Sequence, residues 1–202
     1  MNHMLLVPVL LPLICGALLM TTARSPIKQV RFISVSSIVL LLLSTCYLLF
    51  AANTGQIFVY ALGNWSAPFG IALVLDRLSA LLLVVTAVLA VFVILYAVRG
   101  DDQRGGYFHA LIQFQLAGIN GAFLTGDLFN LFVFFEILLI ASYALLLHGL
   151  GAARLRAALH YVVLNLIGSS LFLIAAGVFY GVAGTLNMVD LARFVAQAEG
   201  DQ

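Results

Sequence analysis

Charged residues are scarce in this sequence. They make up 8% of its 202 residues, whereas 64% are hydrophobic and the mean hydropathy is +1.16. Ordinary globular domains carry roughly 25% charged residues, so this composition excludes a typical water-soluble domain. Apolar runs near 20 residues long indicate a polytopic membrane protein. Because the runs are continuous rather than alternating, and because lipid offers the backbone no hydrogen bonds, we expect an all-α integral membrane fold.

Cysteine is almost absent. Cys15 and Cys46 fall inside predicted spans, at depths that differ by about nine residues, or ~13 Å along a helix axis. Disulfide-bonded Cα atoms lie within ~7 Å of each other, so we expect no disulfide and interpret both cysteines as small apolar core residues. The sequence also lacks metal-ligand spacing, a nucleophile arrangement and a phosphate-binding loop, so we expect neither a metal, a cofactor nor an enzymatic reaction.

Six apolar segments are long enough to cross a bilayer. The predicted spans are 4–20, with Pro8 and Pro12 inside it, 32–51, 73–98, 107–125, 128–148 and 157–182. The first span lacks the basic region of a signal peptide, and its positive charges follow it, so we interpret it as a membrane helix.

The basic residues alternate between the loops. Seven of the nine follow the first, third and fifth spans: Arg24, Lys28, Arg31, Arg99, Arg104, Arg154 and Arg156. Arg77 and Arg193 are the remaining two. The positive-inside rule makes the side of the seven cytoplasmic and places both termini outside.

The external segment "NTGQIFVYALGNWSAPFG" carries no charge. Its alternating run, 57–62, is followed by turn-like residues. A small β-hairpin and a plain loop anchored in the interface by Trp65 fit this pattern equally well. Asp76 and Asp127 are expected to cap the helices that follow them, and the tail after the last span is expected to form a short amphipathic surface helix.

One carboxylate, Glu136, lies near the middle of the fifth predicted span. Placing an ionised group at that depth costs roughly 2.5–3.5 kcal/mol. The carboxyl either stays protonated in its apolar surroundings or faces a hydrated cavity or a cation. In both cases we expect its helix face, with Phe129, Val133, Ile140 and Tyr143, to point into the bundle. Intramembrane acids are functional by default, so we favour a proton relay over a purely structural, protonated glutamate.

Other polar side chains in the spans are candidates for lining a proton path. The candidates are Gln113, Asn120, Tyr143, His160, Asn165 and Ser169. For the stripes on the fourth and sixth spans taken alone, contacts between helices are the favoured interpretation. His109, His148 and His160 fall near the cytoplasmic ends, where we favour a structural role over proton supply.

Two further features concern the partners of these spans. Gly177 and Gly181 have the GxxxG spacing, a weak packing signal. The single lysine, Lys28, lies in a loop, so Glu136 has no lysine partner within the predicted spans.

Three stretches carry a resemblance to a known family. They are "TGDLFNLFVFFEILLIASYALLLHG", "NWSAPFGIALVLDRLSALLLVVTAV" and "LHYVVLNLIGSSLFLIAAGVFYGVAGTLNMVDLA". Together they resemble the antiporter-like subunits of proton-pumping complexes. The nearest match is the D subunit of the multi-subunit Mrp-type cation/proton antiporters, and the wider relatives are the M and N subunits of bacterial respiratory complex I. The resemblance runs over nearly the whole chain.

The resemblance implies the N-terminal part of a polypeptide of about fourteen helices with inverted repeats. Residues 1–106 would hold three N-terminal helices and the external loop 52–72, and residues 107–202 the first three helices of the first repeat plus a tail. Glu136 matches the glutamate of the family's fifth helix, whose lysine partner would lie beyond residue 202. A fragment, a truncated product and one half of a split gene all fit this expectation.

The resemblance also implies a function. It is that of a membrane component of a multi-subunit sodium or potassium/proton antiporter in a bacterial plasma membrane, with other antiporter subunits as partners and no nucleic acid. Two alternatives stay open, a proton-pumping component of an NADH–quinone oxidoreductase and a non-transporting assembly scaffold.

Overall fold

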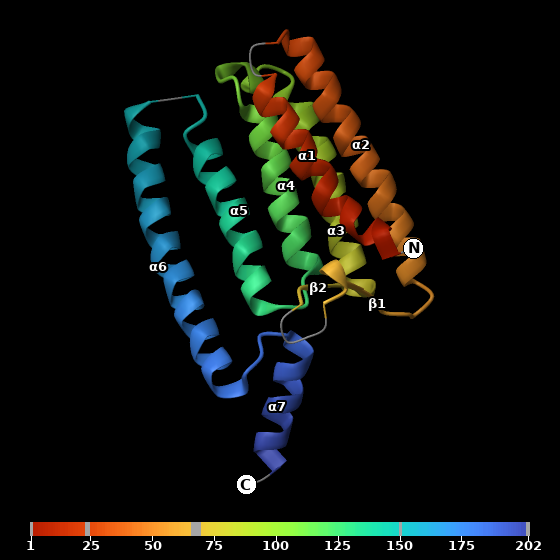
Figure 1. The fold of residues 1–202 in the computed structure, drawn as a ribbon. Coiled ribbons are helices and arrows are strands. Elements are labelled where there is room, and N and C mark those ends of the chain that lie inside the picture. Colours follow the sequence, from red (N-terminus) through yellow and green to blue (C-terminus); the bar gives the residue numbers. More distant parts are fainter. Residues whose placement is uncertain (1, 23–24, 66–69, 150, 201–202) are drawn as a thin grey trace.

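The computed structural model describes residues 2–22, 25–65, 70–149 and 151–200, which form a bundle of long helices with a small hairpin at one end (Figure 1). Its elements are η1 (Asn2–Leu6), α1 (Val7–Thr21), α2 (Ile27–Ala52), β1 (Phe58–Ala61), η2 (Leu62–Asn64), β2 (Ala72–Leu75), α3 (Arg77–Ala97), η3 (Asp101–Arg104), α4 (Phe108–Leu124), α5 (Leu128–Leu146), α6 (Ala152–Ala183) and α7 (Met188–Gly200).

The predicted all-α membrane architecture is confirmed. Five helical segments of the described chain are long and apolar enough to cross a membrane. The shorter α4, with 17 residues, is not one of these five but packs between them in the bundle. The boundaries differ most in three places. Helices α2 and α6 begin five residues earlier than predicted, and α3 begins at Arg77 because the apolar residues Ala72–Leu75 pair as a strand instead.

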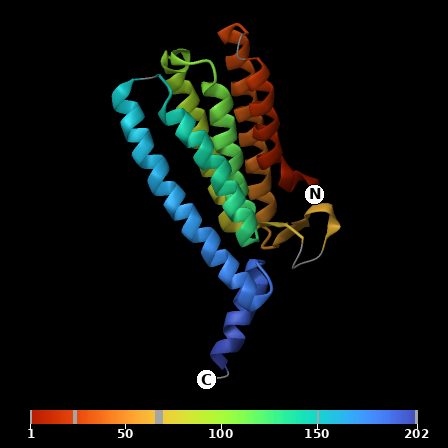
Figure 2. The same cartoon turned by 60° about the vertical axis from the view of Figure 1, so that its left-hand side comes forward.

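The connections between helices gather at two ends of the bundle (Figures 1 and 2). The α1–α2 connection, η3 and the α5–α6 connection form what we call the basic end. The strands β1 and β2, the α4–α5 turn and the α6–α7 connection form the hairpin end, beyond which α7 extends. Of the seven basic residues expected on one side, six lie at the basic end, and Arg24 lies outside the described residues.

Of the two alternatives for the uncharged segment before the third span, the β-hairpin is correct. Strands β1 and β2 pair antiparallel, with Phe58 opposite Leu75 and Ala61 opposite Ala72, while residues 66–69 lie outside the described part. The backbone N–H of Gly126 donates to the Ala72 carbonyl over 2.9 Å, and the N–H of Met188 donates to the Gly126 carbonyl over 2.9 Å. The α4–α5 turn is therefore joined by its backbone to both the hairpin and the start of α7.

The two predicted caps and the tail helix are also correct. Asp76 accepts a hydrogen bond from the Ser79 N–H over 2.7 Å, and Asp127 accepts one from the Asn130 N–H over 2.9 Å. Each carboxylate accepts a hydrogen bond from a donor that the first turn of a helix leaves free. The positive end of the helix dipole also stabilises its negative charge. The bond from Ser79 holds the pKa of the Asp76 carboxyl below its ordinary value.

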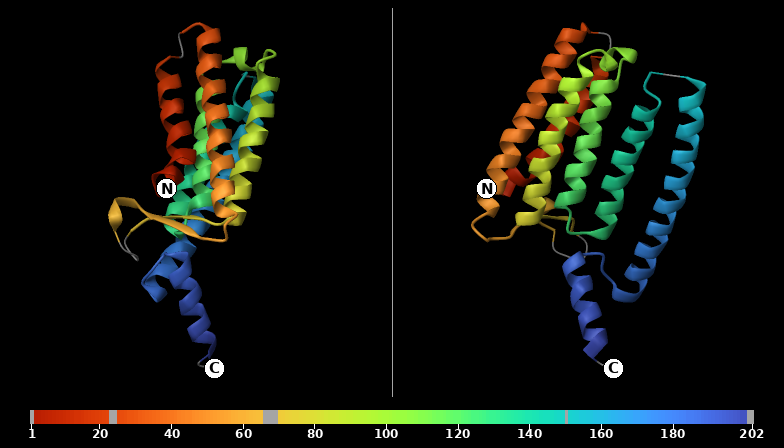
Figure 3. Two further views of the ribbon diagram at one scale, coloured as in Figure 1. Left: turned by 90° about the vertical axis from the view of Figure 1, so that its right-hand side faces the viewer. Right: turned by 180° about the vertical axis from the view of Figure 1, so that it is seen from behind.

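Helices α1 to α4 pack closely, α5 packs on α4, and α6 packs chiefly on α5 as the outermost helix (Figure 3). Close approach of α4 and α5 depends on glycine, because a Cβ at Gly118 would lie 2.7 Å from the backbone nitrogen of Leu138.

The interpretation of both cysteines as core residues holds for Cys15 only. Cys15 is buried, whereas Cys46 is exposed on the outer side of α2. Thr45 and Leu48 occupy the inward side of the same turns. An apolar side chain fits a lipid-facing position as well as a core position, so hydrophobicity alone did not distinguish the two cysteines.

Candidate functional site

The candidate site is built on α5, whose start is fixed by the Asp127 cap and whose 19 residues are apolar except for a few positions. Glu136 is the ninth residue of this helix, which places it near mid-membrane. The opposite face of α5, with Phe134 and Leu138, packs against the glycines of α4. The carboxyl of Glu136 therefore points away from α4. It lies on the side of α5 that α6 covers in part and that is otherwise open.

Glu136 is half-buried, and its Oε1 is a buried atom with no hydrogen-bond partner in the described part of the chain. Beside it, Phe132 stacks on Phe172 of α6 with ring centroids 6.2 Å apart, and Phe135 meets the same ring edge-on at 6.4 Å. These aromatic contacts between α5 and α6 make the surroundings of the carboxyl apolar and supply no hydrogen-bond donor. An ionisable group in this position is poorly solvated and lacks a fixed partner.

Two more predicted site residues share the α5–α6 interface with Glu136. The ring of Tyr143 meets Tyr161 of α6 edge-on at 5.6 Å. Tyr143 lies two turns after Glu136 on the same face of α5, and Asn165 lies one turn after Tyr161 on α6. The Nδ2 of Asn165 is buried and has no hydrogen-bond partner among the residues described. The structure thus brings together Glu136, Tyr143 and Asn165, with unused hydrogen-bonding capacity on two of them.

His160 and Ser169, both on α6, make local contacts. The imidazole Nδ1 of His160 lies 2.9 Å from the Arg156 carbonyl, and the ring is exposed. Ser169 donates to the Leu166 carbonyl of its own helix over 3.3 Å. Both hydrogen bonds are made to the preceding turn of the same helix, so neither connects these residues to Glu136.

Gln113 and Asn120 lie on the faces of α4 that contact α2 and α1, not on the glycine face that contacts α5. They therefore do not meet Glu136. Gln113 is fully buried, accepts a hydrogen bond from Ser37 over 3.2 Å and donates to the Ser34 carbonyl over 3.3 Å. Both serines belong to α2, so Gln113 joins two helices.

The role of Asn120 follows from a proline. Asn120 is also fully buried, and its Nδ2 donates to the Pro8 carbonyl over 2.8 Å. Pro12 has no N–H to donate to that carbonyl four residues earlier, so the amide of Asn120 satisfies an acceptor that a proline inside α1 leaves free. This contact could have been expected from Pro12, but the sequence does not identify the donor.

The expectation that the whole Glu136 face points into the bundle is wrong for three residues. Phe129, Val133 and Ile140 are 48%, 38% and 62% exposed. These three side chains are largely uncovered by the described residues, although Tyr143 on the same face contacts α6. The glycines of the GxxxG spacing are similarly open, because a Cβ at Gly177 or Gly181 would meet no described atom within 4 Å.

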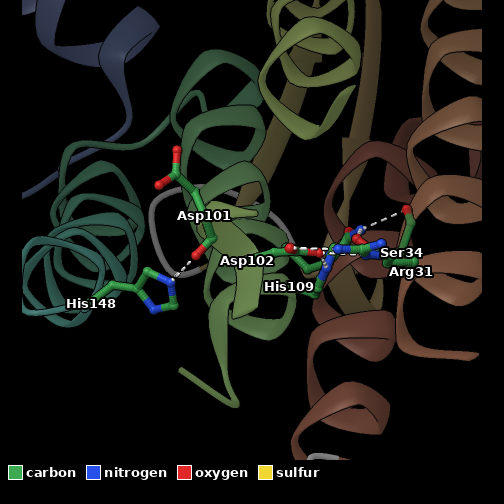
Figure 4. A network of polar contacts seen from close by, with 7 residues as sticks. Arg31, Ser34, Asp101, Asp102, His109 and His148 are labelled. Carbon is green, nitrogen blue, oxygen red and sulfur yellow. Dashed lines mark hydrogen bonds and ion pairs between the residues drawn. The ribbon is translucent and has the colours of Figure 1, made fainter. Parts of the chain in front are cut away.

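A second polar cluster, at the basic end, was missed by the sequence analysis (Figure 4). The guanidinium of Arg31 donates to both oxygens of Asp102, over 2.7 Å from Nε and 2.8 Å from its terminal nitrogen. His109 Nε2 lies 3.1 Å from the same carboxylate, and its Nδ1 is buried without a partner in the described chain. The hydrogen bonds from Arg31 hold the pKa of the Asp102 carboxyl below its ordinary value.

This cluster ties η3 to α2 and α4. Beside it, His148 Nε2 lies 2.7 Å from the Asp101 carbonyl and connects η3 to the end of α5 (Figure 4). The sequence signal was an acidic pair, Asp101 and Asp102, between two apolar spans. Its partner Arg31 is 71 positions away, so the pairing required the fold.

The segment that carries Glu136 is similar to proteins of known families. Residues 125–201, which include Glu136, match the family described as NADH:quinone oxidoreductase/Mrp antiporter, transmembrane. The D subunit of a probable K⁺/H⁺ antiporter of Rhizobium meliloti (strain 1021) is 50% identical over 98% of this chain and 38% of its own length. Residues 125–201 thus match the transmembrane model of this family, and nearly the whole chain is similar to antiporter D subunits.

A second curated relative gives a similar result. The D subunit of the Na⁺/H⁺ antiporter of Alkalihalophilus pseudofirmus is 42% identical over 98% of this chain and 41% of its own length. The chain spans about two fifths of these curated relatives.

Among solved structures, a chain of the archaeal membrane-bound sulfane sulfur reductase superposes with a TM-score of 0.88 at 31% identity, over 96% of this chain and 40% of that one. A chain of the Mrp complex from Dietzia sp. DQ12-45-1b gives 0.85 at 31% identity, over 93% of this chain and 36% of that one. Respiratory complex I from Thermus thermophilus gives 0.75 at 28% identity, over 93% and 38%. The multi-pass membrane fold is therefore that of this family's subunits.

Proposed function

We propose that this chain carries the proton-relay carboxyl of a monovalent cation/proton antiporter, and that this carboxyl is Glu136. The observation that carries the proposal is a half-buried carboxyl in the middle of an apolar membrane helix, with one oxygen buried and unpaired in the described chain. An acid at this depth is costly, and such acids are typical of proton relays. The antiporter relatives support the choice of protons and of sodium or potassium as the exchanged ions.

In the proposed mechanism, Glu136 gains and loses a proton as its surroundings change. Apolar surroundings favour the neutral carboxyl, and an approaching cation favours the charged one. The open side of α5, with Phe129, Val133 and Ile140, leaves room for a helix that carries such a cation. Tyr143 and Asn165 are the proposed next groups of the path, because they share the interface with Glu136. Gln113 and Asn120 are proposed to hold helices together.

The proposed orientation places the basic end in the cytoplasm and both termini outside. The six described basic residues at that end support it, as does the lack of acid or base in strands β1 and β2. The proposed partners are the other subunits of a hetero-oligomeric antiporter in a bacterial plasma membrane. The Mrp complex among the structural neighbours supports such an assembly.

The test is Glu136→Gln in the assembled antiporter that contains this chain. The amide keeps the shape of the side chain and removes its titration. Sodium- or potassium-driven proton exchange, followed with a pH-sensitive dye in inverted vesicles, should fall to background while native gels show the complex intact. Asp190→Asn, which removes a carboxylate on α7 outside the spans, is the matched control and should exchange at the normal rate. Normal exchange by Glu136→Gln would remove the relay role and favour the scaffold.

The runner-up is a proton-pumping component of an NADH–quinone oxidoreductase. The observation in its favour is the superposition on complex I, although the TM-score is lower than for the Mrp complex. The same vesicles decide between the two. Exchange driven by a sodium or potassium gradient, with no NADH present, supports the antiporter. Proton movement that requires NADH and quinone supports the runner-up.

A further inference from the structure

A cavity of about 540 Å³ opens at the basic end, between α3, η3, α4 and the α5–α6 connection, and it plays no part in the proposed relay. Two arginines, Arg104 and Arg154, line its mouth together with His148. Residues of α3, among them Phe92 and Val93, line its inner wall. A polar, cationic mouth above an apolar wall is the form expected of a site for an amphiphile.

The two arginines converge at one point. A Cβ placed on Gly149 would lie 3.2 Å from a terminal nitrogen of Arg154 and 3.4 Å from Cδ of Arg104. The φ of Gly149 is +88°, a conformation that glycine adopts freely, and the missing side chain leaves space for the Arg154 guanidinium and the aliphatic stem of Arg104. Arg154 donates to the His148 carbonyl, which fixes its position.

The charge at the mouth is positive. Arg104 lies 3.2 Å from Asp101, an exposed pair in which the arginine is 57% exposed. Among the described residues that line the cavity, Asp101 is the one acid, against two arginines. A guanidinium has five N–H donors, so both arginines keep donors free for an anion.

The inner wall is suited to a hydrocarbon chain. Phe92 and Tyr96 lie one helical turn apart on α3 and are 65% and 71% exposed. They extend the cavity from the level of η3 into the depth of the membrane. Large aromatic side chains exposed at this depth meet apolar chains rather than water.

We propose that this cavity binds an anionic phospholipid of the leaflet at the basic end, with its phosphate between Arg104 and Arg154 and an acyl chain along Phe92 and Val93. Charge complementarity selects an anionic over a zwitterionic lipid. Basic pockets between transmembrane helices are known to hold such headgroups. The site joins α3 and η3 to α5 and α6. A bound lipid would therefore link the closely packed helices α1 to α4 with the less buried helices α5 and α6.

The test measures lipid binding to the purified chain in detergent by native mass spectrometry. The probes are phosphatidylglycerol and phosphatidylcholine with identical acyl chains. The wild-type chain should prefer phosphatidylglycerol, and the double variant Arg104→Gln/Arg154→Gln should bind it about thirtyfold more weakly, at roughly 1 kcal/mol for each charge removed. Equal binding of the two lipids by the wild type would overturn the proposal.

The control double variant is Arg99→Gln/Arg156→Gln. It removes the same charge from the same end, at exposed residues that do not line the cavity, and its affinity should change by less than about threefold. Equal losses in the two double variants would mean that only general surface charge is sensed. Thermal unfolding followed by circular dichroism verifies that both variants are folded.

A third arm separates a lipid site from an anion site. Val93→Trp fills the apolar wall while keeping both arginines, and it should weaken phosphatidylglycerol binding. Inorganic phosphate at millimolar concentration should not displace the lipid from the wild-type chain. Displacement by phosphate, together with unchanged binding by Val93→Trp, would assign the cavity to a free anion or an acidic protein segment instead.

Discussion

Asn120 on α4 and Asn165 on α6 are the same residue type inside the membrane-spanning part, but the structure uses them differently. The amide nitrogen of Asn120 donates to the carbonyl that Pro12 leaves free in α1. The amide nitrogen of Asn165 is equally buried from solvent and meets no acceptor in the described chain. The first contact is complete within this chain, whereas the second leaves a polar group available beside Glu136.

Helices α1 to α4 differ from helix α6 in the same way, in how far their polar and apolar side chains are satisfied by other helices of this chain. In α1 to α4, buried polar side chains such as Gln113 and Asp102 bridge helices, and small residues allow close packing. In α6, 6% of the most apolar stretch is buried, against 39% for α1. Because lipid solvates apolar side chains as well as protein does, stability in a membrane comes from packing and hydrogen bonds between helices. Substitutions in α1 to α4 should therefore destabilise this chain more than substitutions on α6.

The largest effect is expected for Asp102→Ala. The Asp102 carboxylate is fully buried, whereas Arg31 is 23% exposed. Breaking a buried pair costs about 3–5 kcal/mol, and partial hydration of Arg31 places the expected loss near 3 kcal/mol. The measurement is unfolding by sodium dodecyl sulfate in mixed micelles, followed by circular dichroism.

Asp101→Ala is the matched control for that loss. The neighbouring Asp101 pairs with Arg104 at the surface, and its removal should cost less than about 1 kcal/mol. Similar losses for both variants would contradict the distinction between the buried cluster and the surface pair.

Acid should remove the same stabilisation in the wild type. Arg31 holds the pKa of Asp102 below its ordinary value, so the folded state favours the charged carboxylate. The contribution is fully present above the pKa of an unfolded aspartate, ~3.9, and is lost as the pH falls through the lower folded value. The stability difference between the wild type and Asp102→Ala should therefore shrink on acidification below about pH 4. A difference that stays constant to about pH 2 would contradict the role of this ion pair.

The next effect is expected for Gly118→Ala, at the contact between α4 and α5. The added Cβ would lie 2.7 Å from the Leu138 nitrogen and 2.9 Å from the Phe134 carbonyl oxygen, which are backbone atoms that cannot turn aside. Overpacking of this kind costs about 1–3 kcal/mol. The same unfolding assay measures it. A stability equal to the wild type would show that α5 moves away from α4 without loss and is not held by this contact.

The sequence predicted the parts of this structure that depend on local signals. Asp76 and Asp127 precede apolar helices and are recognisable as caps, and continuous apolar runs located the spans to within a few residues. Residues 73–75 were assigned to a helix because a short apolar strand that continues into an apolar helix also forms a continuous apolar run.

The orientation of each helix about its axis was harder to predict. Cys46 and Ile140 are apolar whether they face lipid or protein, so their exposure leaves no mark in the sequence. Glu136 was identifiable as a candidate site because an acid in a membrane span is rare. The Arg31–Asp102 pair was not identifiable, because nothing in the sequence indicates which distant charge an acid will meet.

The smallest effect is expected for Gly177→Ala, which makes the same chemical change as Gly118→Ala in an open environment. A Cβ at Gly177 meets no described atom within 4 Å, so no clash opposes the gain of up to about 1 kcal/mol that alanine brings to a helix interior. In the isolated chain this variant should be as stable as the wild type or slightly more stable. A loss as large as that of Gly118→Ala would mean that α6 packs more tightly than its exposure indicates. In the proposed antiporter assembly, a loss of complex on native gels with unchanged stability of the chain alone would identify the GxxxG face of α6 as a surface that another helix covers.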